Sequence, residues 1–272
     1  MVNFQKSGRD SSALVGATGY VGQSLLTQRS FSHQYSSRNI AEIQKQEFSL
    51  VVCCAAPAKK WIANRQPEAD RQNIEALTAH LETVTCDHFV LISTVDVFQL
   101  PLAVSESSPV DEQGLHAYGL NRRLLEKFVE NHFPNHLIVR LPGLVGPGLR
   151  KNVVFDFLHQ NNLHDIDSRG VFQFYPMVNL WYDIQTALQA RLSLVHLTAE
   201  PISVATVAEQ GFNRTFVQET VTHPALYDMR TEHAALFGGT GTYQYSQRES
   251  IQAIRAYAQS EPLKVEQLQG AR

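Results

Sequence analysis

The sequence contains no long uncharged apolar run, and this absence argues against a membrane-spanning helix. A helix that crosses a bilayer needs roughly eighteen consecutive apolar residues, and no window of the 272-residue chain provides them. Residues 1–9 are polar and lack the apolar core of a secretory signal peptide. We therefore expect a cytoplasmic protein without a membrane partner.

Cysteine is scarce as well. The chain has only Cys53, Cys54 and Cys86, and no pair has the C-x-x-C spacing of a metal site. On a strand, the neighbours Cys53 and Cys54 would point to opposite faces of the sheet. We interpret all three as small buried apolar side chains in a reducing compartment.

An excess of charge of either sign is also missing. The formal net charge is −3, which gives no overall attraction to a nucleic acid backbone. The basic patches at 59–60 and 150–151 are short, and we interpret them as surface charge. Histidine is more frequent, but Pro134 interrupts the closest pair at helical spacing, His132 and His136. We expect neither a nucleic acid partner nor a metal site.

What the sequence does contain is an alternation of apolar β-type runs with amphipathic helical stretches. This alternation is typical of a parallel sheet flanked by helices. Glycine and proline become frequent after Pro142, which indicates a smaller and less regular lobe. The expected strands cover 12–15, 33–37, 50–55, 88–94 and 137–141, and the expected helices cover 21–28, 67–81 and 115–131.

Three glycines separate the first expected strand from the first expected helix, in the segment GATGYVG at 16–22. Such a turn lets the backbone approach a pyrophosphate, which the amides at the helix N-terminus then bind. The alternative is a tight turn without a ligand. We predict a dinucleotide site formed by Gly16, Thr18, Gly19, Tyr20, Val21 and Gly22.

The G-x-x-G-x-x-G spacing resembles the extended short-chain dehydrogenase/reductase family, also called the NAD-dependent epimerase/dehydratase family. Further stretches resemble this family in the same order along the chain: Ala55-Ala56-Pro57, Asn73, Ser93-Thr94 with Val97-Phe98, Tyr118 with Arg122, and the segment 140–148. The resemblance implies an α/β fold with a Rossmann-type doubly wound parallel sheet. It implies a dinucleotide-binding core at 1–141 and a substrate-binding lobe at 142–272 that returns segments to the core.

The resemblance also implies a catalytic centre at Tyr118, Arg122 and Thr94. Hydride transfer at a carbonyl carbon requires a proton at its oxygen, and a tyrosine needs nearby positive charge to ionise near neutral pH. Four residues apart on a helix, Tyr118 and Arg122 share one face. Arginine stands where the family usually has lysine, and the two are not equivalent. The alternative is a tyrosine in an apolar patch and a surface ion pair.

Family likeness also assigns the remaining cofactor contacts. It implies that Ala55, Ala56 and Pro57 face the adenine ribose. It also implies that Asn73, Tyr118 and Arg122 bind the cofactor, and that the backbone near Pro142 and Leu144 contacts the nicotinamide. Ser37 and Arg38 follow the second expected strand, where no acidic residue precedes Glu42. Arg38 suits a 2′-phosphate, so NADP is favoured over NAD, unless this segment is misaligned.

The substrate side is less defined. Asp96 follows Thr94 by two residues, but the acidic pair of the family's dehydratases is incomplete. Arg150, Lys151 and Asn152 are candidates for holding a diphosphate. We expect an NAD(P)-dependent oxidoreductase or epimerase acting on a sugar-like, nucleotide-linked alcohol or ketone, and we leave a homodimer open. The alternative is a dinucleotide-binding sensor or scaffold protein that has lost turnover.

Overall fold

The computed structural model describes residues 11–262, so the polar segment 1–9 lies outside the described residues. The chain divides into two compact units. The first unit contains the chain up to Leu100, then Glu106–Leu141 and Leu180–His196. The second contains Pro101–Ser105, Pro142–Asn179 and the chain from Leu197 onward. Within the described part, no helix is both long enough and apolar enough to cross a membrane.

The first unit contains a six-stranded sheet in which all neighbouring strands are parallel, in the order β10-β6-β4-β3-β1-β2. β1 lies between β2 and β3, so the chain moves to one side of β1 and then returns to the other. Ligands of open α/β sheets bind at such a reversal, beyond the carboxyl ends of the strands. The strands are β1 (Ser12–Val15), β2 (His33–Tyr35), β3 (Glu47–Cys53), β4 (Thr85–Thr94), β6 (His136–Leu141) and β10 (Leu194–His196).

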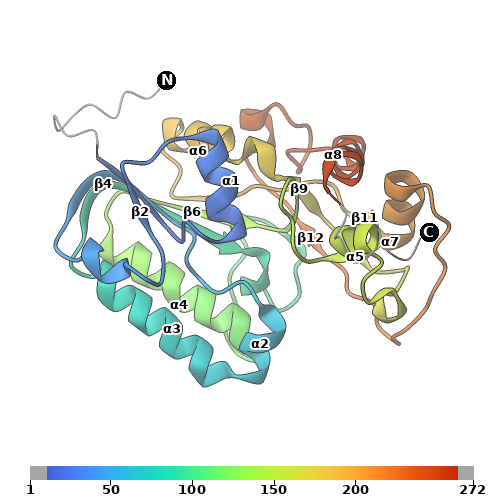
Figure 1. The fold of residues 1–272 in the computed structure, drawn as a ribbon, viewed down its shortest axis with the longest axis horizontal. Coiled ribbons are helices and arrows are strands. Elements are labelled where there is room, and N and C mark those ends of the chain that lie inside the picture. Colours follow the sequence, from blue (N-terminus) through green and yellow to red (C-terminus); the bar gives the residue numbers. More distant parts are fainter. Residues whose placement is uncertain (1–10, 263–272) are drawn as a thin grey trace. The chain divides into compact units, whose positions relative to one another are not determined.

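Helices cover both faces of this sheet. Figure 1 shows α3 and α4 side by side on one face and α1 with α6 on the other. Because both faces are covered, the second half of β3 is apolar, and residues 50–53 are all 0% exposed. The helices of this unit are α1 (Tyr20–Gln28), α2 (Lys60–Arg65), α3 (Pro67–Leu81), α4 (Ala117–His132) and α6 (Leu180–Gln189), with 3-10 helices η1 (Ile40–Ile43) and η2 (Val95–Val97).

The expected doubly wound α/β fold is therefore confirmed. The helix expected over 67–81 has the same bounds as α3, and Ile74, Leu77 and Leu81 are buried as its spacing predicts. β10 was not among the expected strands. It has only three residues, so its apolar pattern is too short to distinguish it from a loop. β3 and β4 begin three residues earlier than expected, where the polar residues Glu47 and Thr85 still pair across the sheet.

Short elements make up the second unit, which has no large sheet among the described residues. Three two-stranded sheets pair β5 (Leu102–Val104) with β12 (Asp228–Met229), β7 (Gly143–Val145) with β9 (Phe174–Pro176), and β8 (Val171–Phe172) with β11 (Ile202–Ser203). The helical elements are α5 (Val153–His159), η3 (Leu163–Asp165), η4 (Met177–Asn179), α7 (Val204–Thr206), the π-helix η5 (Val207–Gly211), η6 (Ala234–Phe237) and α8 (Gln247–Ser260).

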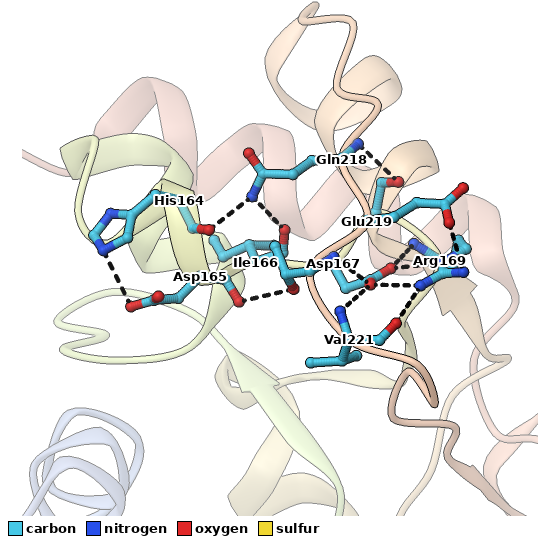
Figure 2. Close-up of polar contacts among 10 residues, drawn as sticks. His164, Asp165, Ile166, Asp167, Arg169, Gln218, Glu219 and Val221 are labelled. Carbon is cyan, nitrogen blue, oxygen red and sulfur yellow. Dashed lines mark hydrogen bonds and ion pairs between the residues drawn. The ribbon is translucent and has the colours of Figure 1, made fainter.

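Hydrogen bonds to backbone replace regular pairing in part of the second unit (Figure 2). The Asp167 carboxylate accepts hydrogen bonds from Arg169 and from the amides of Thr220 and Val221. The side-chain bond from Arg169 is the main reason that the pKa of Asp167 lies below its usual value. Gln218 donates to carbonyls of the segment 163–166. These contacts fix a loop that has no helix or strand of its own.

Candidate active site

Gly16 follows directly on β1 and occupies the point where the strand order reverses. Its φ is +93°, and a Cβ there would lie 2.7 Å from the backbone of Cys54, which follows β3. The amides of Gly16 and Ala17 donate to the carbonyl of Tyr35, the last residue of β2, at 2.9 and 3.0 Å. Only glycine fits this conformation and this close approach. The turn is therefore held between the carboxyl ends of β2 and β3.

The helix that follows begins without a side-chain cap. Gly19 is the N-cap residue of α1, and Thr18 and Gly19 are exposed. Because the first amides of a helix have no partner within it, an uncapped N-terminus attracts anions. Gly22 lets α1 approach this turn, since a Cβ there would lie 2.2 Å from the Gly16 carbonyl oxygen. This arrangement fits the pyrophosphate of a dinucleotide.

The other residues expected at the cofactor differ in their surroundings. Ala55 and Ala56 follow β3 and are half-buried, and the backbone of Ala55 lies beside Gly16. Ser37 and Arg38 are exposed shortly after β2, which ends at Tyr35, two residues earlier than expected. Asn73 is exposed on α3.

Thr94 and Tyr118 come together at the same edge of the sheet. Thr94 is the last residue of β4, and its hydroxyl lies close enough to the Tyr118 side chain to lower the pKa of that tyrosine. Adjacent Ser93 points the other way, because successive side chains of a strand alternate between faces. Its hydroxyl donates to buried Glu126 at 2.5 Å. Of the two neighbouring hydroxyls, only Thr94 is placed to act with Tyr118.

Tyr118 lies in the first turn of α4, whose start is fixed by several polar contacts. His116 caps the helix, with its Nδ1 accepting from the amide of Gly119 at 3.0 Å. Burial, and then the charge of Lys60, lower the pKa of His116, which suits an imidazole that accepts a hydrogen bond. The helix packs closely on η2, since a Cβ on Gly119 would lie 2.0 Å from the Asp96 carbonyl oxygen. This approach brings Tyr118 to Thr94.

Arg122 is buried beneath Tyr118 and is only 3% exposed. Its guanidinium forms an ion pair with the Asp70 carboxylate and donates to the Pro57 carbonyl. The guanidinium carbon lies 4.0 Å from the centre of the Tyr118 ring, within cation–π range. Its Nε is buried and makes no hydrogen bond to the part of the chain that the structure describes. Arg122 thus joins α4, α3 and the loop after β3.

A second charged pair lies near the tyrosine. The ammonium group of Lys60, the first residue of α2, is 2.7 Å from the Asp96 carboxylate. Burial raises the pKa of Tyr118 above its ordinary value, and Asp96 adds to this effect. Arg122, Lys60 and the hydrogen bond from Thr94 act in the opposite direction. Burial has the larger effect, so the tyrosine is protonated at neutral pH.

Sequence reasoning identified Thr94, Tyr118, Arg122 and Asp96 but missed Asp70 and Lys60. Asp70 is 5% exposed and pairs with Arg122 and with Asn121, whose amide donates to it at 2.8 Å. A signal for Asp70 was present, since it stands one helical turn before Ile74 on the apolar face of α3. An acid at such a position needs a buried partner. Lys60 gave no comparable signal, because exposed lysines are common.

The remaining candidates belong to the second unit. Pro142 is buried and Leu144 is half-buried, at the start of β7. Arg150 and Lys151 are exposed. The Asn152 side chain caps α5 by accepting from the amides of Val154 and Phe155, and it donates to the Leu144 carbonyl at 2.8 Å. The contacts of Asn152 therefore stabilise the local turn.

Thiol chemistry has no support in this structure. Cys53 is buried, and burial raises its pKa to about 11. Cys54 and Cys86 are half-buried, and burial raises the pKa of each, for Cys86 to about 12. All three thiols therefore stay protonated at neutral pH, which agrees with their interpretation as apolar side chains. Within residues 11–262, no group of three or more His, Cys, Asp or Glu side chains could hold a metal ion.

No family model and no curated protein sequence matches the chain. Solved structures do. A dTDP-4-dehydrorhamnose reductase from Clostridium acetobutylicum is 19% identical with a TM-score of 0.71, over 95% of this chain and 99% of that one. The same enzyme from Bacillus anthracis, in complex with NADP, is 16% identical with a TM-score of 0.71, over 93% and 100%.

A third similar structure is an NAD-dependent NDP-hexosamine 5,6-dehydratase of tunicamycin biosynthesis. It is 18% identical with a TM-score of 0.71, over 94% of this chain and 99% of that chain. Of these three enzymes of nucleotide sugars, the Bacillus reductase binds NADP and the dehydratase depends on NAD, and each match extends over nearly the whole length of the other protein. The chain therefore has the fold that these enzymes share, which is the fold implied by its resemblance to the extended short-chain dehydrogenase/reductase family.

Proposed function

We propose that the chain is an NAD(P)-dependent reductase of nucleotide-linked sugar ketones, within the extended short-chain dehydrogenase/reductase family. One observation carries the proposal: the Thr94 hydroxyl and the Tyr118 side chain lie next to one another at the same sheet edge as the uncapped glycine turn. A positioned hydroxyl pair beside a dinucleotide site is the arrangement that carbonyl reduction requires. The fold shared with nucleotide-sugar enzymes supports the substrate class.

The residues of the chain have separate roles in this proposal. The glycine turn and the N-terminus of α1 would hold the pyrophosphate, with Ala55 and Ala56 alongside. When bound, a reduced nicotinamide supplies a hydride to the carbonyl carbon. Tyr118 donates its proton to the carbonyl oxygen, and Thr94 donates a hydrogen bond that orients this oxygen. The resulting tyrosinate recovers a proton from solvent.

The protonation of Tyr118 favours reduction over alcohol oxidation. Reduction needs the protonated phenol, whereas oxidation needs the phenolate as a base. Because the pKa of Tyr118 is raised, the phenol form dominates throughout the neutral range and is lost only as the pH rises through that raised pKa. Epimerisation would require both forms in one cycle, so simple ketone reduction fits this tyrosine better.

We further propose a preference for NADP. The support is Arg38, which is exposed directly after β2 in a segment without an acidic residue. An arginine there suits the 2′-phosphate, whereas an acid would bind the free ribose hydroxyls.

A second candidate function is a dinucleotide-binding protein without turnover. The burial of Arg122 favours it, because a guanidinium committed to Asp70 and Pro57 is not available to a nicotinamide ribose. The two functions are separated by one experiment. The purified protein is titrated with NADPH by calorimetry and then supplied with NADPH and dTDP- or UDP-linked 4-keto sugars while absorbance is followed. Binding with turnover supports the reductase, binding alone supports the second candidate, and no binding refutes both.

A further inference from the structure

Two residues of this chain, Arg122 and Lys60, supply the positive charge near Tyr118. Tyrosine ionises near pH 10 in water, so a catalytic phenol depends on the charges around it. Arg122 supplies a charge from below the ring, at 4.0 Å from its centre, but its guanidinium is 3% exposed and bound to Asp70 and Pro57. A guanidinium that is buried and bound to two partners cannot change its position when Tyr118 loses or regains its proton.

Lys60 differs from Arg122 in its exposure to solvent. Its side chain is 36% exposed. Lys60 is the first residue of α2, directly after the loop that follows β3. Its ammonium group contacts the Asp96 carboxylate at 2.7 Å, and that carboxylate is 16% exposed. The Asp96 amide donates to the Thr94 hydroxyl at 3.2 Å, and the Tyr118 side chain lies next to that hydroxyl. Asp96 therefore lies next to the Thr94 hydroxyl, and Lys60 is held there by its ion pair with Asp96.

We propose that Lys60 and Asp96 form a charge pair that sets the protonation of the Tyr118 hydroxyl, with Lys60 as the accessible cation of the site. Asp96 is a positioning residue that holds the ammonium group and opposes its charge. Arg122 is then chiefly a structural cation that joins α4, α3 and the loop after β3. The inference rests on the proposed function in taking Tyr118 as the proton donor.

Other charged groups face Tyr118 as well. Arg122 lies under the ring from the same helix, and Asp70 of α3 reaches the tyrosine only through Arg122. His116 caps α4, with a lowered pKa, and contributes no charge at neutral pH. These groups are the same in every variant considered below. Changes in the ionisation of Tyr118 can therefore be assigned to the Lys60–Asp96 pair.

The two members of the pair must act with opposite signs. Lys60→Gln removes the favourable charge and leaves Asp96, so the phenolate becomes less stable and the pKa of Tyr118 rises. Asp96→Asn removes the unfavourable charge and leaves Lys60, so the pKa falls. At a fixed pH below the pKa, we expect the phenolate-to-phenol ratio to change roughly threefold to tenfold in each direction, the range for a partly screened charge a few ångströms away. An ion pair with only a structural role would respond alike to either loss.

The test is an NMR titration of protein labelled with ¹³C at tyrosine Cζ, which needs no substrate. The Tyr118 resonance is the one that disappears in Tyr118→Phe. Tyrosinate fractions are compared at pH 9.5, where an ordinary lysine is still mostly protonated, in the parent, Lys60→Gln, Asp96→Asn and Lys60→Arg. Arg71→Gln, which breaks the exposed Arg71–Glu75 pair on α3, is the control.

The expected order of tyrosinate fraction is Asp96→Asn, then the parent with Lys60→Arg and Arg71→Gln, then Lys60→Gln. Equal fractions in all five proteins, or shifts of Lys60→Gln and Asp96→Asn in the same direction, would overturn the inference. This readout is independent of turnover. If the ordering holds but no keto sugar is reduced, the proposed function fails while the charge pair stands.

Discussion

Arg122 is the residue that most distinguishes this site from the pattern that its sequence resembles. Lysine at this position would be a flexible point charge, whereas the guanidinium here is planar, buried and bound by Asp70 and Pro57. Its charge acts on Tyr118 through the face of the ring. These contacts favour a supporting role for Arg122 over the cofactor contact that the resemblance implies.

We expect the loss of Arg122 to lower the free energy of unfolding strongly. Arg122→Met leaves Asp70 buried without its cation, and breaking a buried pair costs about 3–5 kcal/mol of unfolding free energy. The double variant Arg122→Met/Asp70→Leu removes both charges and should recover most of this loss. Urea denaturation measures both. In the control, Arg71→Met on the exposed face of α3, the change should stay below about 1 kcal/mol. A loss in the double variant equal to that in the single one would contradict the paired assignment.

Arg38 carries the prediction on cofactor choice. If it binds a 2′-phosphate, Arg38→Ala should weaken NADP binding by roughly 1.5–3 kcal/mol, the range for a hydrogen bond to a charged group. Binding of NAD should hardly change, because NAD lacks that phosphate. Calorimetric titration of both dinucleotides provides the comparison, with the exposed Arg71→Ala as a control for general charge loss. Equal losses for NADP and NAD would remove Arg38 as the discriminating residue.

The sequence could predict site residues that belong to a recognisable motif. It could not predict site residues that are defined only by contacts between distant parts of the chain. Tyr118 and Thr94 stand in an ordered pattern, and the structure brings their side chains next to one another. Lys60 reaches Asp96 across 36 positions of the chain, a pairing that no local pattern encodes. Asp70 lies between these cases, because its place on an apolar helix face implied a partner without identifying it.

Among the helices, strands and turns, the glycine turn between β1 and α1 allows the most specific test of dinucleotide binding. Gly19 is exposed, and a Cβ there would meet only the Gly16 carbonyl oxygen, at 3.3 Å. A side chain at this position should therefore leave the fold intact while facing the expected pyrophosphate. The turn is thus a place where binding can be tested separately from folding.

Gly19→Asp should abolish or strongly weaken dinucleotide binding, because it adds both bulk and a negative charge at the N-terminus of α1. Gly19→Asn has nearly the same shape without the charge and is the matched control. We expect Asn to bind weakly and Asp more weakly still, with both proteins folded by circular dichroism. Calorimetry measures the affinities. Unchanged affinity in a folded Gly19→Asp protein would move the dinucleotide site away from residues 16–22.

The elements themselves differ in how far sequence could predict them. α3 was predicted with its observed bounds, because proline at its first position and a regular apolar spacing mark a helix clearly. The short strand β2 was predicted although it has one buried residue, Tyr35, among exposed ones. β10 was missed because pairing with β6, rather than its own three residues, makes it a strand.

For the molecule as a whole, a buried charge network anchors the first unit next to the site. Glu126 of α4 is 0% exposed and accepts from Arg140 of β6 at 2.9 and 2.7 Å and from Arg123 at 2.9 Å. Hydrogen bonds from these residues and from Ser93 lower the pKa of Glu126 despite its burial. This network fixes α4 on the sheet, and α4 carries Tyr118. The helix α4 therefore carries both the proposed proton donor, Tyr118, and the buried acid of this network, Glu126.

The central claim is that Tyr118 donates the proton in a reduction, and one measurement tests it most directly. Steady-state reduction of the accepted keto sugar by NADPH is compared between the parent and Tyr118→Phe, with NADPH affinity measured on both. Tyr182→Phe, at a tyrosine 72% exposed on α6, is the matched control. We predict that kcat in Tyr118→Phe falls by roughly two to four orders of magnitude, the usual contribution of a positioned acid, with nearly unchanged affinity for NADPH. Undiminished turnover in Tyr118→Phe would contradict the assignment.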